Sequence, residues 1–565
     1  MSEIPFWIEN WTTRLTASIS PAAYQVSSLE FACIAAYTFV MAVLGMYGLH
    51  RYHLVYLFYK HRDRALGAPA ARFGQLPRVT VQLPIYNEEY MVEQLIESAC
   101  RLDYPRHLLD IQVLDDSTDE TRLAAKQAVK RWTAAGYPIE YIHREHRLGF
   151  KAGALQAGLS RARGEIVAIF DADFRPAPDF LMQTIHYFTD PGVGMVQTRW
   201  TYRNRDESLL TQVQAMLLDG HFVFEHGARF RSGRFFNFNG TAGLLRRAMI
   251  EDAGGWQHDT LTEDTDLSYR AQLRGWKFLY APQVEVLSEL PSDLMSFQVQ
   301  QARWAKGLIQ TGKKILPRLL AAPLPLSTKI EACFHLTANL SYPLMLLLSA
   351  LLLPATIVRF YHGDMKLLWL DVPLFLGTFS SLSTFYLLGQ KELTPGRWRR
   401  KIVFMPLLVA TGIGLTLTNT KAVMEALLGI QSPFQRTAKY NSEAAPTAAS
   451  RRKYQRPAGW LPLANSVVAS YFTACLGYCL LIGNWITTPF LALFVAGYFF
   501  TAGMLSYQAV EHRWAGTGSR LMPWPAPAKS PSILHDYLMP GPGSHAESDA
   551  PAPLLLSQTV AMKDR

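Results

Sequence analysis

The chain has 565 residues, of which 49% are hydrophobic and 12% aromatic, and its formal net charge is +10. This composition excludes an intrinsically disordered protein, and the length allows two or three domains. The positive charge does not indicate a nucleic-acid partner, because Lys and Arg cluster beside apolar segments, as in membrane proteins. The five cysteines are scattered without paired spacing, and we expect buried, reduced thiols.

The chain begins with a short segment of mixed composition at residues 1–27, which lacks the features of a signal peptide. The mostly apolar run at 28–50 is long enough for one transmembrane helix. Basic residues follow directly, so the positive-inside rule predicts that the chain enters the cytoplasm there.

Residues 78–310 change to strand-like runs that alternate with helical stretches. The runs are Val79 to Ile85, Ile111 to Asp116, Ile139 to Ile142, Ile166 to Phe170 and Val193 to Thr198. This alternation predicts an α/β domain in which helices cover both faces of a parallel sheet.

Residues 311–510 return to membrane-like composition. An amphipathic interface helix is expected over Ile309 to Leu326, and further spans at 340–360, 367–388, 461–482 and 485–507, which makes five spans in all. Ile402 to Thr418 has basic loops on both sides, and we interpret it as an interfacial or re-entrant segment. The tail at 516–565 is rich in Pro, Ser, Ala and Gly and is predicted to be disordered.

Two carboxylates, Asp171 and Asp173, come directly after the apolar run at 166–170. Ligands of open α/β sheets bind at the carboxyl ends of the strands, and these acids could share one divalent cation with the diphosphate of a nucleotide sugar. A solvated turn at the end of the strand is the simpler interpretation of such a pair taken alone.

Polar turns after other strands and before a helix add candidate donor-site residues. The turn after the first strand contains Pro84, Tyr86 and Glu88 and is suited to a base or ribose. Asp116 could accept a hydrogen bond from a nucleobase, although capping of the next helix is the alternative for this turn. Lys151, at the start of a helix, favours phosphate, or it is a surface lysine.

Three later motifs could handle an acceptor. Gly240 and Thr241 belong to a small-residue turn that would allow a sugar to approach, or that is simply tight. Glu263 and Asp264 head a predicted helix; Asp264 is the candidate general base, and first-turn acids are the alternative. Gln300, Arg303 and Trp304 share one helix face, where Arg303 could stabilise a diphosphate and Gln300 and Trp304 an acceptor sugar. A membrane-anchoring Arg-Trp pair is the other interpretation.

The order of these motifs resembles that of the processive inverting family 2 glycosyltransferases, which include cellulose, chitin and hyaluronan synthases. Further segments are similar to the cellulose-synthase-like mannan and glucomannan synthases: Phe238 to Gly243, Gly254 to Trp256, and Glu289 to Pro291. A loop at 431–445 resembles the gating loop of cellulose synthases through Phe434, Thr437 and Lys439, with Arg436 where that loop has an apolar residue.

This resemblance implies a GT-A (Rossmann-like) catalytic domain inserted between α-helical transmembrane segments. It implies a hexosyltransferase that polymerises a β-linked polysaccharide of β-1,4-mannan, glucomannan or glucan type from GDP-mannose or UDP-glucose and translocates it across the bilayer. The implied location is the plasma membrane, or the inner membrane of a bacterium, with a cytoplasmic catalytic domain and possible accessory export subunits.

The resemblance also implies a role for each motif. Asp116, Lys151 and Asp171 would hold the donor, with Asp171 and Asp173 on Mg²⁺ or Mn²⁺, and Asp264 would be the base. Transfer of one sugar to a lipid acceptor and an inert scaffold of an export complex are the competing interpretations of the whole chain.

Overall fold

The computed structural model describes residues 27–361, 368–432, 436, 437, 439, 459–485 and 487–514, all within one compact unit of the chain. Residues 1–26 of the N-terminal segment, the tail predicted to be disordered, and Phe434 of the gating-like loop lie outside these described residues.

The domain expected over residues 78–310 contains a seven-stranded sheet in the order β3-β2-β1-β4-β6-β5-β7. The strands are β1 (Val79–Ile85), β2 (Leu109–Asp115), β3 (Ile139–His143), β4 (Ile166–Ile169), β5 (Val193–Tyr202), β6 (Gly243–Arg246) and β7 (Lys277–Ser288). All five strand predictions are confirmed, but the predicted parallel sheet is mixed, because β6 runs antiparallel to both β4 and β5. β3, β2, β1 and β4 are parallel neighbours, so their carboxyl ends share one edge.

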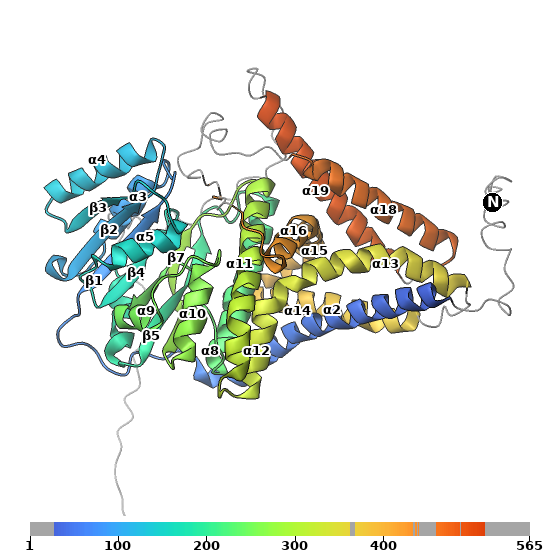
Figure 1. Ribbon diagram of the computed structural model, residues 1–565, viewed down its shortest axis with the longest axis horizontal. Coiled ribbons are helices and arrows are strands. Elements are labelled where there is room, and N and C mark those ends of the chain that lie inside the picture. Colours follow the sequence, from blue (N-terminus) through green and yellow to red (C-terminus); the bar gives the residue numbers. More distant parts are fainter. Residues whose placement is uncertain are drawn as a thin grey trace, which may run out of the picture. The chain divides into compact units, whose positions relative to one another are not determined.

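Helices cover both faces of the sheet, as predicted (Figure 1). Ile166 and Ala168 of β4 join a core with helices α3 (Val92–Cys100), α4 (Thr121–Ala134) and α6 (Phe180–Thr184). Val167 and Ile169 point to the opposite face and join a second core with α5 (Phe150–Leu159), α9 (Arg247–Asp252) and α10 (Glu263–Leu273). The alternation of strand side chains therefore divides one buried strand between two cores.

Shorter helices connect these layers. They are η2 (Arg62–Arg64), η3 (Arg106–Leu108), η4 (Ile185–Thr189), α7 (Leu209–Gly220), the π-helix η5 (His221–His226) and α8 (Gly227–Arg231). α7, η5 and α8 follow one another without a break, between strands β5 and β6.

Four helical segments among the described residues are long and apolar enough to cross a membrane: residues 28–60, 326–359, 461–481 and 488–510. They correspond to helix α2 (Ser28–Lys60), the run of α12 (Leu326–Thr337), η6 (Ala338–Leu340) and α13 (Ser341–Tyr361), α18 (Leu461–Leu481) and α19 (Thr488–Trp514). The expected span at 367–388 falls on helix α14 (Leu368–Leu393), which packs along α2 but is not among the four. Ser27 caps α2 through a capping box with Glu30, so the helix begins where the apolar run begins.

Two further regions refine the membrane-side predictions. The expected interface helix over Ile309 to Leu326 is instead the second half of one long helix, α11 (Leu294–Ala321), which continues through Gly307 and Pro317. The segment at 402–418 folds as η8 (Trp398–Phe404), α15 (Met405–Gly414) and α16 (Thr416–Leu427), with a bend of 42°. A bend of that size fits a broken span or a re-entrant segment, so the re-entrant interpretation stays a prediction.

Candidate functional site

A pocket of about 120 Å³ opens at the carboxyl edge of β1, β2 and β4. Helix α5, helix α11 and the loop that follows α16 complete its walls. The lining residues are Pro84, Ile85, Tyr86, Glu88, Asp116, Arg147, Lys151, Ala154, Asp171, Ala172, Asp173, Gln300, Arg303, Arg436, Thr437 and Lys439. Every donor-site and metal-site residue predicted from the sequence therefore lines a single pocket.

The two strand-end acids are held in different ways. The backbone N–H of Asp171 donates to the hydroxyl of Thr241 at 2.9 Å, so the small-residue turn positions the first acid. Asp173 is buried; its carboxylate accepts a hydrogen bond from Ser288 at 2.6 Å and forms an ion pair with Lys439. Although burial alone raises the pKa of Asp173, Lys439 and Ser288 outweigh it and hold that pKa below its usual range.

Lys151 lies between the strand-end acid Asp171 and the turn that contains Gly240. Its ammonium lies 2.5 Å from the Asp171 carboxylate and donates to the carbonyl of Gly240 at 3.0 Å. Burial alone would lower the pKa of Lys151, but Asp171 and the acids of α10 raise it, so the side chain is a cation. A phosphate bound beside it would meet a permanent positive charge.

Two arginines beside Asp116 and Tyr86, namely Arg144 and Arg147, were not among the residues predicted from the sequence, and Arg147 lines the pocket. Arg144 binds both oxygens of Asp116, at 2.8 and 2.5 Å, so this predicted nucleobase acceptor is already paired in the structure. The guanidinium of Arg147 lies over the ring of Tyr86, 3.4 Å from its centroid. Both arginines lie just before Gly149, after which helix α5 begins. This basic run is the sequence feature that could have identified them.

The gating-like loop enters the pocket from the far end of the sequence. Arg436 donates to both oxygens of Glu88, at 2.8 and 2.5 Å, and Thr437 is buried. At the start of the loop, Ser432 accepts a hydrogen bond at 2.6 Å from Lys306 of α11. Arg436, which stands where the similar loop of cellulose synthases has an apolar residue, thus forms a bidentate ion pair with Glu88 in the turn after β1.

Asp264 and Glu263 begin helix α10 beside the turn that contains Gly240. A Cβ atom on Gly240, whose φ is +80°, would lie 2.9 Å from a carboxylate oxygen of Asp264, so only glycine allows this approach. Burial, together with the negative charge of Glu263, raises the pKa of Asp264 to about 7. Such a carboxyl group can exchange a proton near neutral pH.

The last acid of this motif has a structural role. Asp266 is buried, accepts a hydrogen bond from Arg270 at 2.8 Å and pairs with Lys314 at 2.9 Å. These contacts attach the first turn of α10 to α11. They leave Glu263 and Asp264 as the two acids of the motif that face the pocket charges.

Helix α11 contributes the third predicted motif. Gln300 and Arg303 line the pocket, while Trp304 is half-buried on the same helix and does not line it. Burial lowers the pKa of Arg303, and Glu263, Asp171, Asp264 and Asp173 oppose that effect. Arg303 therefore faces both the acids that follow β4 and the acids at the start of α10.

The described residues contain no group of three or more His, Cys, Asp or Glu side chains that could hold a metal ion by themselves. Asp171 and Asp173 supply two carboxylates, and Mg²⁺ is commonly bound by one or two carboxylates together with substrate phosphates. This donor set fits a cation that arrives with a diphosphate.

The family comparison covers nearly the same residues as the α/β domain predicted at 78–310. Residues 77–307 match the model of the family described as "Glycosyltransferase like family 2". Glucomannan 4-beta-mannosyltransferase 1 of Cyamopsis tetragonoloba is 32% identical over 461 residues, which cover 79% of this chain and 84% of that protein.

Glucomannan 4-beta-mannosyltransferase 2 of Arabidopsis thaliana is 46% identical over 268 residues, or 46% of this chain. In that match the chain spans about half the length of the relative, 49%. Among solved structures, the mannosyltransferase PcManGT from Pyrobaculum calidifontis, in complex with GDP-Man and Mn²⁺, is 21% identical with a TM-score of 0.44, over 71% of this chain and all of that one.

Proposed function

The chain belongs to the cellulose-synthase-like glycosyltransferases of family 2, and on that premise we propose that it is a membrane-embedded mannosyltransferase that extends a β-1,4-linked mannan or glucomannan. The family resemblance inferred from the motifs is thereby confirmed. The names of the relatives support mannose as the sugar. The donor would then be GDP-mannose, with UDP-glucose as the alternative.

One observation carries this proposal: the pocket at the carboxyl edge of the sheet combines strand-end carboxylates with five cationic side chains. The cations are Arg147, Lys151, Arg303, Arg436 and Lys439. A nucleotide diphosphate bound with a divalent cation matches this combination, since phosphates require positive charge and the cation requires carboxylates. An inert scaffold has no use for such a set.

Mg²⁺ or Mn²⁺ would be held by Asp171 and Asp173 and would neutralise charge on the diphosphate of the donor. Lys151 and Arg303 would bind the phosphate oxygens from opposite walls, and these charges would stabilise the departing nucleoside diphosphate. Arg147 on Tyr86 offers a flat cationic surface against which a base could stack.

Asp264 would accept the proton of the acceptor hydroxyl as that oxygen attacks the anomeric carbon. Its raised pKa, about 7, makes it a stronger base than an ordinary aspartate. Direct displacement by the acceptor inverts the anomeric centre and needs no covalent intermediate. Gln300 and Trp304 would hold the acceptor sugar, Trp304 by stacking.

Growth of a polymer requires a path away from the site. Buried polar side chains lie where α11 packs against α16, namely Gln298 of α11 and Thr416 and Asn419 of α16. The bent pair that contains α16 would count as a further span, and buried polar groups in a span commonly mark a transport path, so these residues support passage of the glycan beside α16. We place the catalytic domain in the cytoplasm of a cell whose plasma membrane holds the chain.

The test is product analysis with the purified full-length protein in detergent, supplied in parallel with labelled GDP-mannose and UDP-glucose and with Mg²⁺ or Mn²⁺. Long β-1,4-linked mannose-containing polymer is the expected product. A single sugar attached to lipid would replace the proposal by lipid glycosylation, and absence of turnover with every donor would support the scaffold interpretation.

A further inference from the structure

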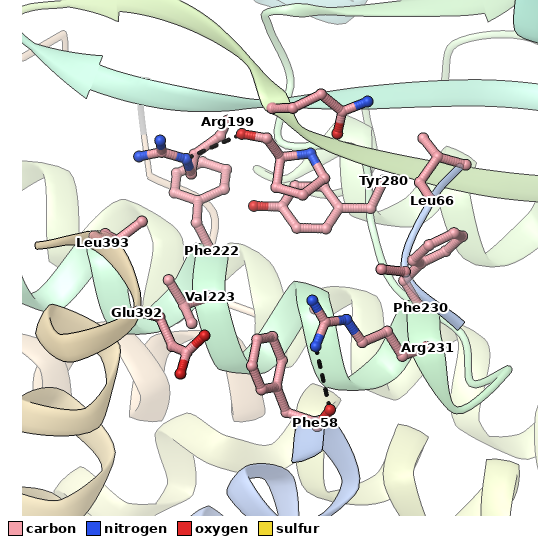
Figure 2. A pocket seen from close by; sticks show the side chains of 14 residues that line it. Phe58, Leu66, Arg199, Phe222, Val223, Phe230, Arg231, Tyr280, Glu392 and Leu393 are labelled. Atoms are coloured by element: carbon pink, nitrogen blue, oxygen red, sulfur yellow. Dashed lines mark hydrogen bonds between the residues drawn. The ribbon is translucent and has the colours of Figure 1, made fainter. Parts of the chain in front are cut away.

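The π-helix η5 is the irregular part of the continuous helical stretch α7–η5–α8. π-helical turns are rare and occur frequently at functional sites. Two side chains of η5, Phe222 and Val223, line a cavity of about 220 Å³ outside the catalytic pocket (Figure 2). Because packing against that part of η5 is incomplete, the polar contacts of two of its other residues, His221 and Glu225, have more weight in fixing its position.

The imidazole of His221 lies between two hydrogen-bond acceptors. Its Nδ1 is 2.7 Å from a carboxylate oxygen of Glu225, and its Nε2 is 3.3 Å from Oδ1 of Asn239. Asn237 orients the Asn239 amide, because Nδ2 of Asn237 donates to Oδ1 of Asn239 at 3.0 Å and to the Phe238 carbonyl at 2.9 Å. A carboxylate and an amide oxygen only accept, so both ring nitrogens of His221 donate. His221 is therefore a doubly protonated ring that links Glu225 to Asn239.

Glu225 is in turn fixed by a buried cation. A guanidinium nitrogen of Arg229 lies 3.8 Å from the same Glu225 oxygen, and Arg229 also donates to Glu331 of α12 at 2.9 Å. Burial alone raises the pKa of Glu225, but His221 and Arg229 outweigh it and hold that pKa well below its usual range. The Glu225 carboxylate is therefore charged and accepts from His221.

Asn239 precedes Gly240 in the turn that lies between the strand-end acid and the candidate base. The hydroxyl of Thr241 accepts a hydrogen bond at 2.9 Å from the backbone N–H of Asp171. The missing Cβ of Gly240 leaves room for the carboxylate of Asp264. A shift of this turn would therefore change the position of Asp264 relative to Asp171.

We propose that His221 is a positioning residue for glycosyl transfer: it fixes the turn that begins at Asn239, so that Asp264 stays where it can accept the proton of the acceptor hydroxyl. This inference rests on the proposed function. Glu225 contributes by fixing the His221 ring and stabilising its charge. His221 lines neither the catalytic pocket nor the cavity beside η5, so it acts through Asn239 rather than on a substrate.

Two substitutions of His221 separate positioning from packing. His221→Gln keeps an N–H donor that can reach Asn239, whereas His221→Phe has no donor but keeps a ring between its neighbours. Those neighbours are Phe222 and His226, with ring centroids 5.4 and 4.5 Å from that of His221. In the purified full-length protein in detergent, supplied with GDP-mannose and Mn²⁺, His221→Phe should lower kcat about tenfold and His221→Gln less than about threefold. The loss is partial because Gln197 still accepts from the backbone N–H of Asn239 at 2.8 Å.

Donor binding should not follow kcat. The dissociation constant of GDP-mannose, measured by calorimetry, should stay within about twofold of the parent value in both variants, since no contact with the donor is removed. A kcat of His221→Phe equal to or above that of His221→Gln would show that the ring only packs, and would overturn the proposal.

Asn239→Ala tests whether the effect passes through Asn239. In that background His221→Phe should cause less than about twofold further loss of kcat, because the group on which His221 acts is gone. A further loss of about tenfold would refute this connection.

The matched control is His186→Phe, the same exchange at a histidine of η4, whose ring accepts a hydrogen bond at 3.1 Å from the backbone N–H of Phe73. Its kcat should equal that of the parent protein, and an equal loss in both variants would overturn the proposal. Hydrogen exchange of the peptide spanning residues 237–243 needs no turnover, and it should become faster in His221→Phe but not in His186→Phe. Unchanged exchange in His221→Phe would overturn the positioning itself, whereas faster exchange in a protein whose parent form shows no turnover would contradict the proposed function alone.

Discussion

Replacing Lys439 by methionine should change metal binding and donor binding in opposite directions. In the structure the Lys439 ammonium pairs with Asp173, one of the two carboxylates assigned to the metal. A hydrogen bond between charged groups contributes about 1.5–3 kcal/mol. Removing the ammonium makes Asp173 available, so Mn²⁺ should bind the donor-free enzyme about tenfold to a hundredfold more tightly.

The donor should respond in the other direction. When nucleotide sugar and metal occupy the pocket, Lys439 is expected to leave Asp173 and to bind the diphosphate, so Lys439→Met should also raise the KM for the donor. Mn²⁺ affinity is measured by electron paramagnetic resonance titration without nucleotide, and donor KM by initial rates at saturating Mn²⁺.

Lys277→Met is the matched control, because Lys277 pairs with Asp190 at 3.0 Å on the exposed surface. Its Mn²⁺ affinity should equal that of the parent protein. An unchanged Mn²⁺ affinity in Lys439→Met, or an equal gain in Lys277→Met, would refute competition between the loop and the metal.

Other substitutions test the remaining roles. The raised pKa of Asp264, about 7, predicts that kcat/KM falls as pH decreases through 7, because the base becomes protonated, and that Glu263→Gln moves this limb to lower pH; a profile that is flat through pH 7 would contradict the assignment. Asp264→Asn should abolish transfer while calorimetry still detects donor binding; polymer formed by this variant would exclude Asp264 as the base. Arg436→Gln should expose the loop to limited proteolysis and weaken donor binding about tenfold, since it removes the bidentate contact with Glu88; an unaltered cleavage pattern and donor affinity would count against the loop contact. Trp304→Ala should weaken acceptor binding about threefold to tenfold through lost stacking, measured as the KM for added oligosaccharide, and an unchanged KM would indicate a membrane anchor.

The sequence was sufficient for the first half of the sheet and for its acids. The buried runs at β1, β2 and β4 end in polar turns, and parallel neighbours bring those ends to one edge, so Glu88, Asp116 and Asp171 had to converge. The four-residue β6 was missed because it is too short for a period to be visible, and Pro282 interrupts the pattern of β7. Neither the short β6 segment nor the interrupted pattern of β7 indicated that β6 runs antiparallel to its neighbours.

Contacts between distant segments were not predictable from local pattern. Arg144 could be seen as a basic residue before a helix, but its pairing with Asp116 depends on the curvature of a loop. Glu88 and Arg436 are 348 positions apart, and nothing in the composition of either segment identifies the other. Local periodicity and turn chemistry therefore predicted where the site lies, while the partners of its charges required the tertiary structure.

The distance along the chain between Glu88 and Arg436 bears on how the enzyme can be engineered. A chimera that exchanges residues 77–307 with a relative would join a foreign first turn to the resident loop and break this bidentate pair. The donor preference of such hybrids would then reflect the loss of the Glu88–Arg436 ion pair rather than the properties of the exchanged domain. Exchange of residues 77–307 together with residues 431–439 keeps both halves of the pocket from one parent, and extending the first segment to Lys314 also keeps its pair with Asp266.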